Sequence, residues 1–357
     1  MADGSDSGVS RKTIVRILKG VGILLAVVLV GSLSYATYWN ITRPDGYSQF
    51  ARDVAIRVKS YDPPEVRDGL RVITYNIGWA VGPYQETIKD RIELEAYKRN
   101  LDEIVRVVVE MNADIVLLQE VELGSDRSYG MDQLDYLQEK LGWKYAACAV
   151  DWNRYIPLEG VGKIHKCVAV LSRYPIVKHE RKRFTFNPHL ENRIVNFFYY
   201  PFVWTSPTQY VQIAYKDKTL NVYNLHLSVF SRKNRALQMK DALDCIERGN
   251  LEQNLILGGD FNFHARVIRK GINWKDDVDY LHRPPFFQDI WRRIPGIQEA
   301  FINAHSTNEQ IHQNVTFLEK KQRFDFIFFS DDFQKAGANV IHGISSSDHL
   351  PVYLELN

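Results

Sequence analysis

Residues 254–262 read NLILGGDFN, and residues 345–352 read SSSDHLPV. In the first stretch, an apolar run typical of a buried strand ends on Asp260 and Asn262. In the second stretch, Asp348 and His349 stand directly before another apolar run. A single carboxylate at a strand end is usually a turn or cap residue, so each stretch alone has an ordinary structural explanation.

The same arrangement recurs along the chain. Four further apolar runs carry such side chains: Asn76 in RVITYN, Glu120 in DIVLLQE, Asn224 and His226 in NVYNLHL, and Asp325 in RFDFIFF. One of them alone would be explained as a core histidine or a buried ion-pair partner. Their repetition predicts instead that they converge on one edge of a β-sandwich. Carboxylate and amide oxygens there suit a hard cation such as Mg²⁺ or Mn²⁺, and the sequence offers no thiolate set that would favour zinc.

Taken in order, the motifs TYN, LQE, NLHL, GDFN, FDFIF and SDHLPV resemble the endonuclease/exonuclease/phosphatase superfamily. That superfamily includes deoxyribonuclease I, abasic-site endonucleases, neutral sphingomyelinases, inositol polyphosphate 5-phosphatases and deadenylases. The resemblance runs from about Leu70 to Leu356. It implies an α+β fold, a four-layer α/β/β/α sandwich of two mostly antiparallel sheets. It also implies a divalent-metal-dependent phosphoesterase in which a water molecule attacks the phosphorus.

The resemblance implies a metal-binding group and a water-binding group. Glu120 is expected to ligate the metal, supported by Asn76 and Asp348. Asp260 is expected to orient or deprotonate the attacking water, and Asn262 to hold that water and a phosphate oxygen. A cation would neutralise the phosphoester anion, which otherwise repels a nucleophile.

Two histidines complete the site that the resemblance implies. His349, paired with Asp325, is expected to lie against the phosphate and stabilise negative charge, since an aspartate favours the protonated imidazole. His226, with Asn224 beside it, is a candidate acid for the leaving oxygen. The strand with Asp325 lacks the Cys-Asp-Arg pattern of the 5-phosphatases, so we do not expect inositol 5-phosphatase activity.

Two basic groups have open interpretations. Lys163, His165 and Lys166 form either a phosphate-binding edge or a solvated loop. Arg235 and Gln238 stand one helical turn apart, and we expect them to lie on the solvated surface. The three cysteines have no metal-site spacing and are expected to be isolated core thiols.

Residues 20–39 read GVGILLAVVLVGSLSYATYW and carry no charge. Twenty residues of helix span about 30 Å, the thickness of a bilayer's hydrocarbon core. Basic residues precede the run, which predicts a cytoplasmic N-terminus and a non-cytoplasmic catalytic domain. A cleaved signal peptide is the alternative, with small residues at 34–36. The predicted organisation is a cytoplasmic basic arm (1–19), a single-pass anchor (20–39), a stalk (40–68) and the catalytic domain (69–357).

Charge bears on the substrate. Of the 45 basic and 43 acidic residues, four and two lie in the first 39 residues, which leaves 41 of each in the body. A dedicated non-specific nucleic-acid binder usually carries a basic surplus, so this balance argues mildly against one. The sequence carries no feature that sets an oligomeric state.

An aromatic stretch also bears on the substrate. Residues 196–210 read NFFYYPFVWTSPTQY, which is either a hairpin packed on the core or an apolar ledge for lipid or a base. We therefore expect a membrane-anchored phosphoesterase acting on a lipid head group or a related phospho-substrate. A DNA or RNA endonuclease or exonuclease of the deoxyribonuclease I type is the alternative, and a catalytically inactive binding module is a third.

Overall fold

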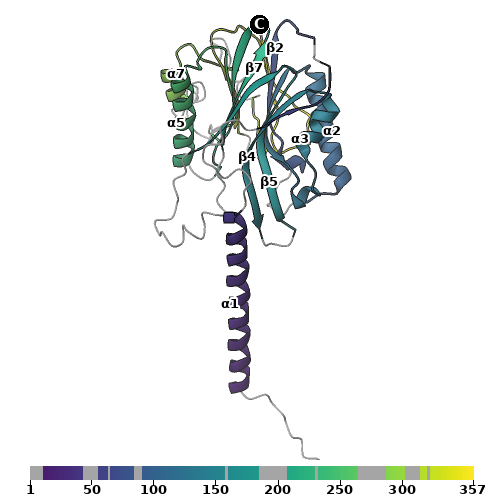
Figure 1. Cartoon of the computed structure of the whole chain (residues 1–357), viewed down its shortest axis with the longest axis vertical. Helices are drawn as coiled ribbons and strands as arrows, with labels where there is room; N and C mark the ends of the chain where they lie inside the picture. Colours follow the sequence, from purple (N-terminus) through teal and green to yellow (C-terminus); the bar gives the residue numbers. More distant parts are fainter. Residues whose placement is uncertain are drawn as a thin grey trace, which may run out of the picture.

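The computed structural model describes residues 11–42, 55–62, 65–83, 91–156, 160–184, 207–229, 232–263, 287–301, 314–319 and 322–357. Two sheets pack face to face, and helices cover both outer faces (Figure 1). The seven-stranded sheet has the order β1-β4-β5-β3-β2-β13-β12, and the six-stranded sheet has the order β10-β11-β9-β8-β7-β6. The predicted four-layer α+β sandwich is confirmed.

The strands of the first sheet are β1 (Ile56–Val58), β2 (Leu70–Asn76), β3 (Ile115–Glu122), β4 (Tyr145–Ile156), β5 (Gly162–Ser172), β12 (Lys335–Val340) and β13 (Val352–Leu356). Those of the second are β6 (Ile176–Arg183), β7 (Pro207–Tyr215), β8 (Lys218–His226), β9 (Leu255–Asp260), β10 (Gln298–Glu299) and β11 (Asp325–Phe329). Only the pairs β2–β3 and β8–β9 are parallel among these strands. Every strand predicted from an apolar run is therefore present.

Helices α2 (Leu94–Glu110) and α3 (Gln133–Leu141) cover the first sheet, and α5 (Arg232–Gly249) and α7 (Gln288–Arg293) cover the second (Figure 1). Helix α2 buries the apolar side chains that recur every three or four residues, including Tyr97, Leu101 and Ile104. Asp132 caps α3 by accepting a 2.9 Å hydrogen bond from the amide of Asp135.

Side-chain alternation decides which residues enter the space between the sheets. In β8, Val222 belongs to the core between the sheets, whereas Tyr223 and Leu225 pack under α5 with Met239. Successive strand residues point to opposite faces. Asn224 and His226 therefore follow Val222 into the inter-sheet space, and the same alternation carries Asp260 inward in β9.

Close approach of β8 and β9 requires Gly259. Its φ is +140°, and a Cβ atom there would lie 1.9 Å from the carbonyl oxygen of Leu225. Only glycine adopts this backbone without strain. The pair Gly258-Gly259 therefore sets the position of Asp260 at the end of β9.

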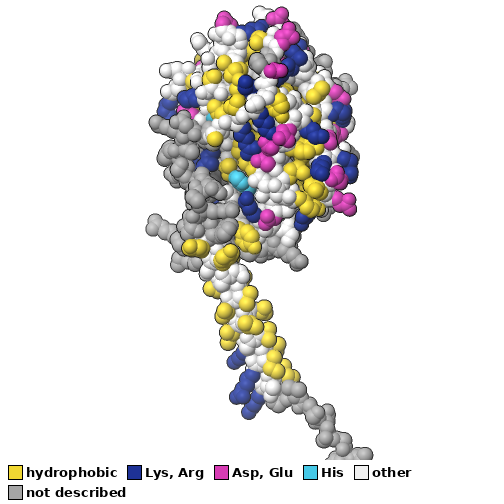
Figure 2. All heavy atoms as spheres, turned by 45° about the vertical axis from the view of Figure 1, so that its right-hand side comes forward, with side chains coloured by type: hydrophobic (Ala, Val, Ile, Leu, Met, Phe, Trp, Pro, Cys, Tyr) yellow, Lys and Arg dark blue, Asp and Glu magenta, His cyan; other side chains and the backbone are white. Residues whose placement is uncertain are grey.

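The N-terminal helix α1 (Arg11–Thr42) projects from one end of the sandwich (Figure 1). Residues Arg11–Tyr35 are long and apolar enough to cross a membrane, and none of the span is buried against the rest of the chain. Figure 2 shows apolar side chains along the helix and basic side chains near its free end. Within the predicted stalk of residues 40–68, Ile56–Val58 form β1 and pair with β4, because Ile56 packs against the main core.

The prediction for the cysteines holds in part, and the one for the aromatic stretch is not tested. Cys148 and Cys167 are buried free thiols as predicted, whereas Cys245 is half-buried. The aromatic stretch at 196–210 lies mostly outside the described residues, which resume at Pro207. The alternatives of a packed hairpin and an exposed ledge therefore both stay open for Phe202 and Trp204.

Candidate active site

One edge of the sandwich collects the polar side chains of the motifs. Asn76, His226 and Asp260 end β2, β8 and β9, and Asp325 begins β11. The register places Asp260 opposite both His226 and Asp325. The parallel pairs β2–β3 and β8–β9 bring the carboxyl ends of their strands to this same edge. Their predicted convergence on one edge is what the strand register produces.

Glu120 reaches this edge through an irregular backbone. The pairing of β3 with β5 shifts between Leu118 and Val121, and Glu120 has a φ of +56°. A non-glycine residue in this region is uncommon, and such residues gather at functional sites. The bulge re-aims the side chain, so that Oε1 of Glu120 lies 3.6 Å from Nε2 of His226.

Lys166 is a buried cation beside Glu120. Its Nζ lies 3.4 Å from Oε1 of Glu120 and 3.8 Å from Oδ2 of Asp151, and the lysine is 0% exposed. The solvated-loop interpretation is therefore wrong for Lys166, because β5 pairs on both sides with β3 and β4 and encloses the side chain. Lys163 and His165 remain partly exposed.

Asp260 lies at the centre of the group. Its Oδ2 accepts hydrogen bonds from Nδ2 of Asn76 (2.9 Å) and Nδ2 of Asn262 (3.2 Å), and its Oδ1 accepts one from the amide of Asn262 (2.8 Å). Burial raises the pKa of Asp260 to about 6, with His349 opposing and Asp325 adding to the rise. A carboxyl group with this pKa can hold or release a proton near neutral pH.

His349 pairs with Asp325 as predicted. Nδ1 of His349 lies 2.8 Å from Oδ2 of Asp325, while Nε2 lies 3.9 Å from Oδ2 of Asp260. The ring of Phe317 packs against the imidazole at 4.9 Å between centroids. Burial lowers the pKa of His349, but the carboxylates of Asp325 and Asp260 outweigh this and raise it to about 10. The imidazolium is therefore the stable form.

His226 lies between three carboxylates. Its Nε2 is 3.6 Å from Glu120 and 3.7 Å from Asp260, and its Nδ1 is 3.8 Å from Oδ2 of Asp151. Asp151 was missed in the sequence. The available signal was a charge inside the apolar run YAACAVDW, the same signal that identified Asp325.

Asn224 lies deeper between the sheets than the other motif residues. Its Nδ2 donates to the carbonyl oxygens of Leu118 (3.0 Å) and Ala169 (2.9 Å), and its Oδ1 accepts from Gln119 (2.7 Å). These bonds tie β8 to the opposite sheet directly beneath His226. The geometry thus gives Asn224 a means of positioning His226.

Asp348 and the start of α5 complete the edge. Asp348 is half-buried; burial raises its pKa, His349 opposes the rise, and the charge of Glu120 adds to it. Arg235 and Gln238 are buried, so their predicted surface location is wrong. Both bind the main chain that follows β8, because Arg235 donates to the carbonyl of Ser228 (2.8 Å) and Gln238 accepts from its amide (2.7 Å).

The donor set fits a divalent cation. Carboxylates at this edge outnumber the cations, even with both histidines protonated: Glu120, Asp151, Asp260, Asp325 and Asp348 against Lys166, His226 and His349. Burial is the main cause of the raised pKa of Asp260 and of Asp348, and a neighbouring carboxylate, Asp325 or Glu120, adds to each rise. Oδ1 of Asp325 is buried without a hydrogen-bond partner among the described residues. Such a site gains from a bound Mg²⁺ or Mn²⁺.

A second candidate ligand group in the structure shares no residue with the predicted set. Asp260, Asp325 and His349 each offer one ligand atom within 4.8 Å of the others. Of the predicted ligands, Asn76 donates a hydrogen bond to Asp260 of this trio, and Asp348 directly precedes His349 in the chain. Assigning Glu120, Asn76 and Asp348 as the metal ligands stays a prediction.

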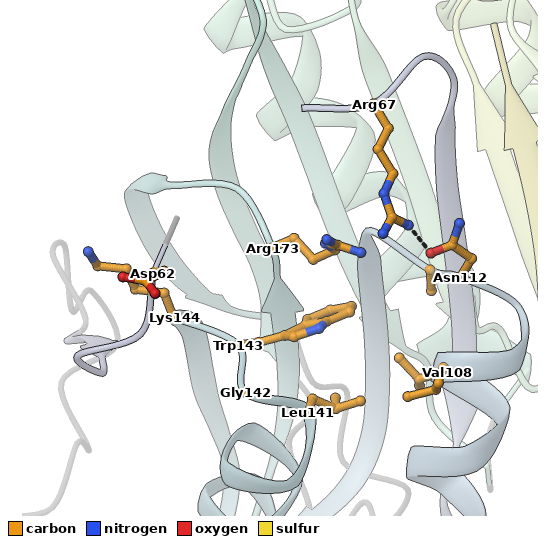
Figure 3. A pocket seen from close by; sticks show the side chains of 11 residues that line it. Asp62, Arg67, Val108, Asn112, Leu141, Gly142, Trp143, Lys144 and Arg173 are labelled. Atoms are coloured by element: carbon orange, nitrogen blue, oxygen red, sulfur yellow. Dashed lines mark hydrogen bonds between the residues drawn. The ribbon is translucent and has the colours of Figure 1, made fainter. Parts of the chain in front are cut away.

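A cavity of about 340 Å³ lies at the opposite edge of the first sheet (Figure 3). Trp143, Arg173 and Arg67 line it, and Arg67 bonds to Asn112. Lys144 and Arg173 flank the start of β4 and the end of β5, the ends far from Glu120. None of the motif residues lines this cavity.

Comparison with known proteins gives a family match. The sequence model of the Endonuclease/Exonuclease/phosphatase family matches residues 73–349, a range that includes every candidate site residue from Asn76 to His349. No curated protein sequence is significantly similar to this chain.

Solved structures share the fold. An endonuclease/exonuclease/phosphatase from Beutenbergia cavernae covers 82% of this chain and 72% of its own, at 19% identity and a TM-score of 0.56. TDP2 from D. rerio was solved in complex with a single-stranded DNA product. The match to it covers 82% of this chain and 100% of that protein, at 15% identity and a TM-score of 0.53. The match to an endonuclease/exonuclease/phosphatase family protein from Leptotrichia buccalis covers 81% of this chain and 99% of that protein, at 17% identity and a TM-score of 0.52. At these identities the likeness shows the fold alone.

Proposed function

Because the chain belongs to the endonuclease/exonuclease/phosphatase family, we propose that it is a divalent-metal-dependent phosphoester hydrolase whose site is the edge at Glu120, Asp260 and His349. The observation that carries the proposal is the arrangement around Asp260. Its carboxylate is held by Asn76 and Asn262, and the His349–Asp325 pair faces it at 3.9 Å.

Asp260 supplies the base. The hydrogen bonds from Asn76 and Asn262 fix its orientation, and its pKa of about 6 leaves it largely ionised at neutral pH, ready to take a proton from water. Asn262 also has a backbone φ of +46°, which turns its amide toward Asp260. Together these groups would orient a water molecule for in-line attack on phosphorus.

The two histidines handle charge on the phosphate. His349, kept protonated by Asp325, offers Nε2–H to a phosphate oxygen and stabilises the charge that develops there. His226 lies on the Glu120 side, with Asp151 at Nδ1, and is the candidate acid for the leaving oxygen. The buried Lys166 neutralises part of the charge of Glu120 and Asp151.

Mg²⁺ or Mn²⁺ would be held by Glu120, with Asn76 and Asp348 in support, and would neutralise the phosphoester anion when bound. The Asp260–Asp325–His349 trio is the alternative ligand set. The two sets predict different effects of substitution on metal affinity: Glu120→Gln should weaken Mn²⁺ binding in the first case and leave it nearly unchanged in the second.

The proposed setting is a membrane. Helix α1 would anchor the chain by a single pass, with residues 1–19 cytoplasmic and the catalytic domain outside, since Arg11, Lys12, Arg16 and Lys19 precede the apolar run. Protease added outside intact cells should then degrade the catalytic domain. Digestion that occurs only after lysis would show the opposite orientation, with the catalytic domain in the cytoplasm.

A phospholipid head group is the preferred substrate class. The anchor keeps the site near a bilayer, and the neutral body lacks the basic surplus of a general nucleic-acid binder. Nuclease activity is the second candidate, favoured by the fold shared with TDP2, which was solved with a DNA product. The full chain in detergent, supplied with Mg²⁺ or Mn²⁺, should be offered DNA, RNA, sphingomyelin and an aryl phosphodiester. Turnover of DNA or RNA alone would reject the lipid assignment.

A further inference from the structure

The anchor helix and the candidate site lie at the same end of the sandwich. The ring of Tyr35 in α1 contacts that of Tyr155 in β4, with centroids 6.3 Å apart and planes at 88°. Tyr35 is the last residue of the apolar span Arg11–Tyr35. The contact therefore fixes which end of β4 lies nearest the point where α1 leaves the membrane.

Strand register places the candidate site at that end. Trp152 of β4 pairs with Lys166, which contacts Glu120, and Tyr155 pairs with Lys163. Tyr155 is thus three residues beyond the level of Lys166, or about 10 Å nearer to α1. The opposite end of β4, at Tyr145, is about 36 Å from Ile156 along a strand of 12 residues.

The extension of β4 and β5 toward α1 has its own small core. Trp152, Val161 and Ile164 form a separate hydrophobic cluster, with Ile156 packed against it. This cluster supports the hairpin beyond the ends of β3 and β9. Figure 1 shows these ends of β4 and β5 beside the end of α1 that is nearest to the sandwich.

The same edge carries partly exposed basic side chains. Lys163 pairs with Tyr155. Arg183 is the last residue of β6 and pairs with Pro207. The next residue of β7, Thr208, pairs with Leu225, which precedes His226. Both lie at the His226 end of their sheets. Basic side chains at a membrane surface attract anionic head groups, and tyrosine rings favour the interface.

The tether is short. Residues 43–55 separate α1 from β1, and a chain of that length spans at most about 45 Å when fully extended. Even if the Tyr35–Tyr155 contact opened, the domain would stay close to its own bilayer. The effective concentration of membrane-bound substrate at the site would therefore be high.

We infer that the edge formed by the β4–β5 hairpin and the candidate site faces the bilayer that holds α1, and that the enzyme hydrolyses the phosphodiester of a phospholipid in that same bilayer. The substrate part of this inference rests on the proposed function. The orientation part rests only on the contact, the register and the tether.

Orientation is tested by fluorescence quenching. The full chain, in a Cys245→Ser background, is labelled at Lys163→Cys or at Val109→Cys and placed in vesicles that contain a head-group nitroxide lipid. Val109 is 63% exposed and lines the cavity at the far end of the sandwich, so it is the matched control. Stronger quenching at position 163 is expected. Equal quenching, or stronger quenching at 109, would overturn the orientation.

Action on the same bilayer is tested with a rigid spacer. About 40 residues of EAAAK repeat inserted after Pro44 would lift the domain by about 60 Å where helical. Head-group release from vesicles of phosphatidylcholine, sphingomyelin and phosphatidylserine should fall about tenfold or more, while turnover of a soluble aryl phosphodiester stays constant. Unchanged head-group release would overturn the inference. Loss of aryl phosphodiester turnover in the unmodified chain would instead reject the proposed function, and the quenching result would still decide orientation.

Discussion

Nζ of Lys166 lies 3.4 Å from Oε1 of Glu120, and the two side chains are almost fully enclosed by protein. Lys59 makes shorter contacts with Asp135 and Glu139, at 2.7 and 2.9 Å, but those carboxylates are 46% and 61% exposed. The Lys166 pair is therefore the longer of the two but the more deeply buried. The buried pair should matter more because water cannot replace the lost partner.

Replacing Lys166 should therefore destabilise the metal-free protein strongly. Lys166→Met leaves Glu120 and Asp151 buried without their ammonium, which costs roughly 3–5 kcal/mol of unfolding free energy. Lys59→Met should cost less than about 1 kcal/mol. Urea denaturation in EDTA measures both. Equal costs would show that Lys166 does not neutralise the site.

Polar strand ends were predictable, and the contacts between their buried neighbours were not. Asp260 stands out because it ends an apolar run, Asp325 because it interrupts one, and His349 because it directly precedes one. Lys166 and Asp151 lie in strands that meet only through the β3–β5–β4 register. A lysine next to such a run is normally solvated, and only non-local pairing shows that this one is enclosed. Likewise, Ile56–Val58 form a strand only because they pair with the outer side of β4, a contact distant in sequence.

Gly259 should be intolerant of a side chain. In Gly259→Ala the added Cβ would lie 1.9 Å from the carbonyl oxygen of Leu225, so the strands must separate, at a cost of about 3 kcal/mol or more. Gly130→Ala is the control, because its φ is +70° but nothing lies within 4 Å of the added atom. It should cost only about 1–2 kcal/mol of backbone strain. Thermal unfolding of the two variants should differ clearly; similar melting temperatures would argue against the close approach.

Stability of the metal-free protein should depend on pH through His349. Its pKa in the folded state, about 10, exceeds the ordinary value of 6.5. The stabilisation is therefore fully present below pH 6.5 and is lost as the pH rises through about 10. Its slope is at most about 1.4 kcal/mol per pH unit. Denaturation in EDTA from pH 6 to 10 should show a smaller slope for His349→Gln than for the wild type. Identical slopes would mean that the histidine is not held protonated.

The two site histidines should affect turnover more than an exposed histidine. His349→Gln and His226→Gln should each lower kcat by roughly 10²-fold, the usual scale for positioned acid–base groups. His342→Gln should leave kcat unchanged, because His342 is exposed and outside the site. Turnover of an aryl phosphodiester, measured on variants whose folding is checked by circular dichroism, tests this. Wild-type turnover in both site variants would place the chemistry elsewhere.

The most direct test of metal-dependent hydrolysis at this edge is aryl phosphodiester turnover by the wild type, Glu120→Gln and Asp260→Asn, each with Mg²⁺ or Mn²⁺ and with excess EDTA. The wild type should be active only with metal. Both variants should lose roughly 10²-fold or more in kcat while remaining folded, since each removes a charge from the site. Full wild-type turnover in excess EDTA, or undiminished turnover in both variants, would contradict the account.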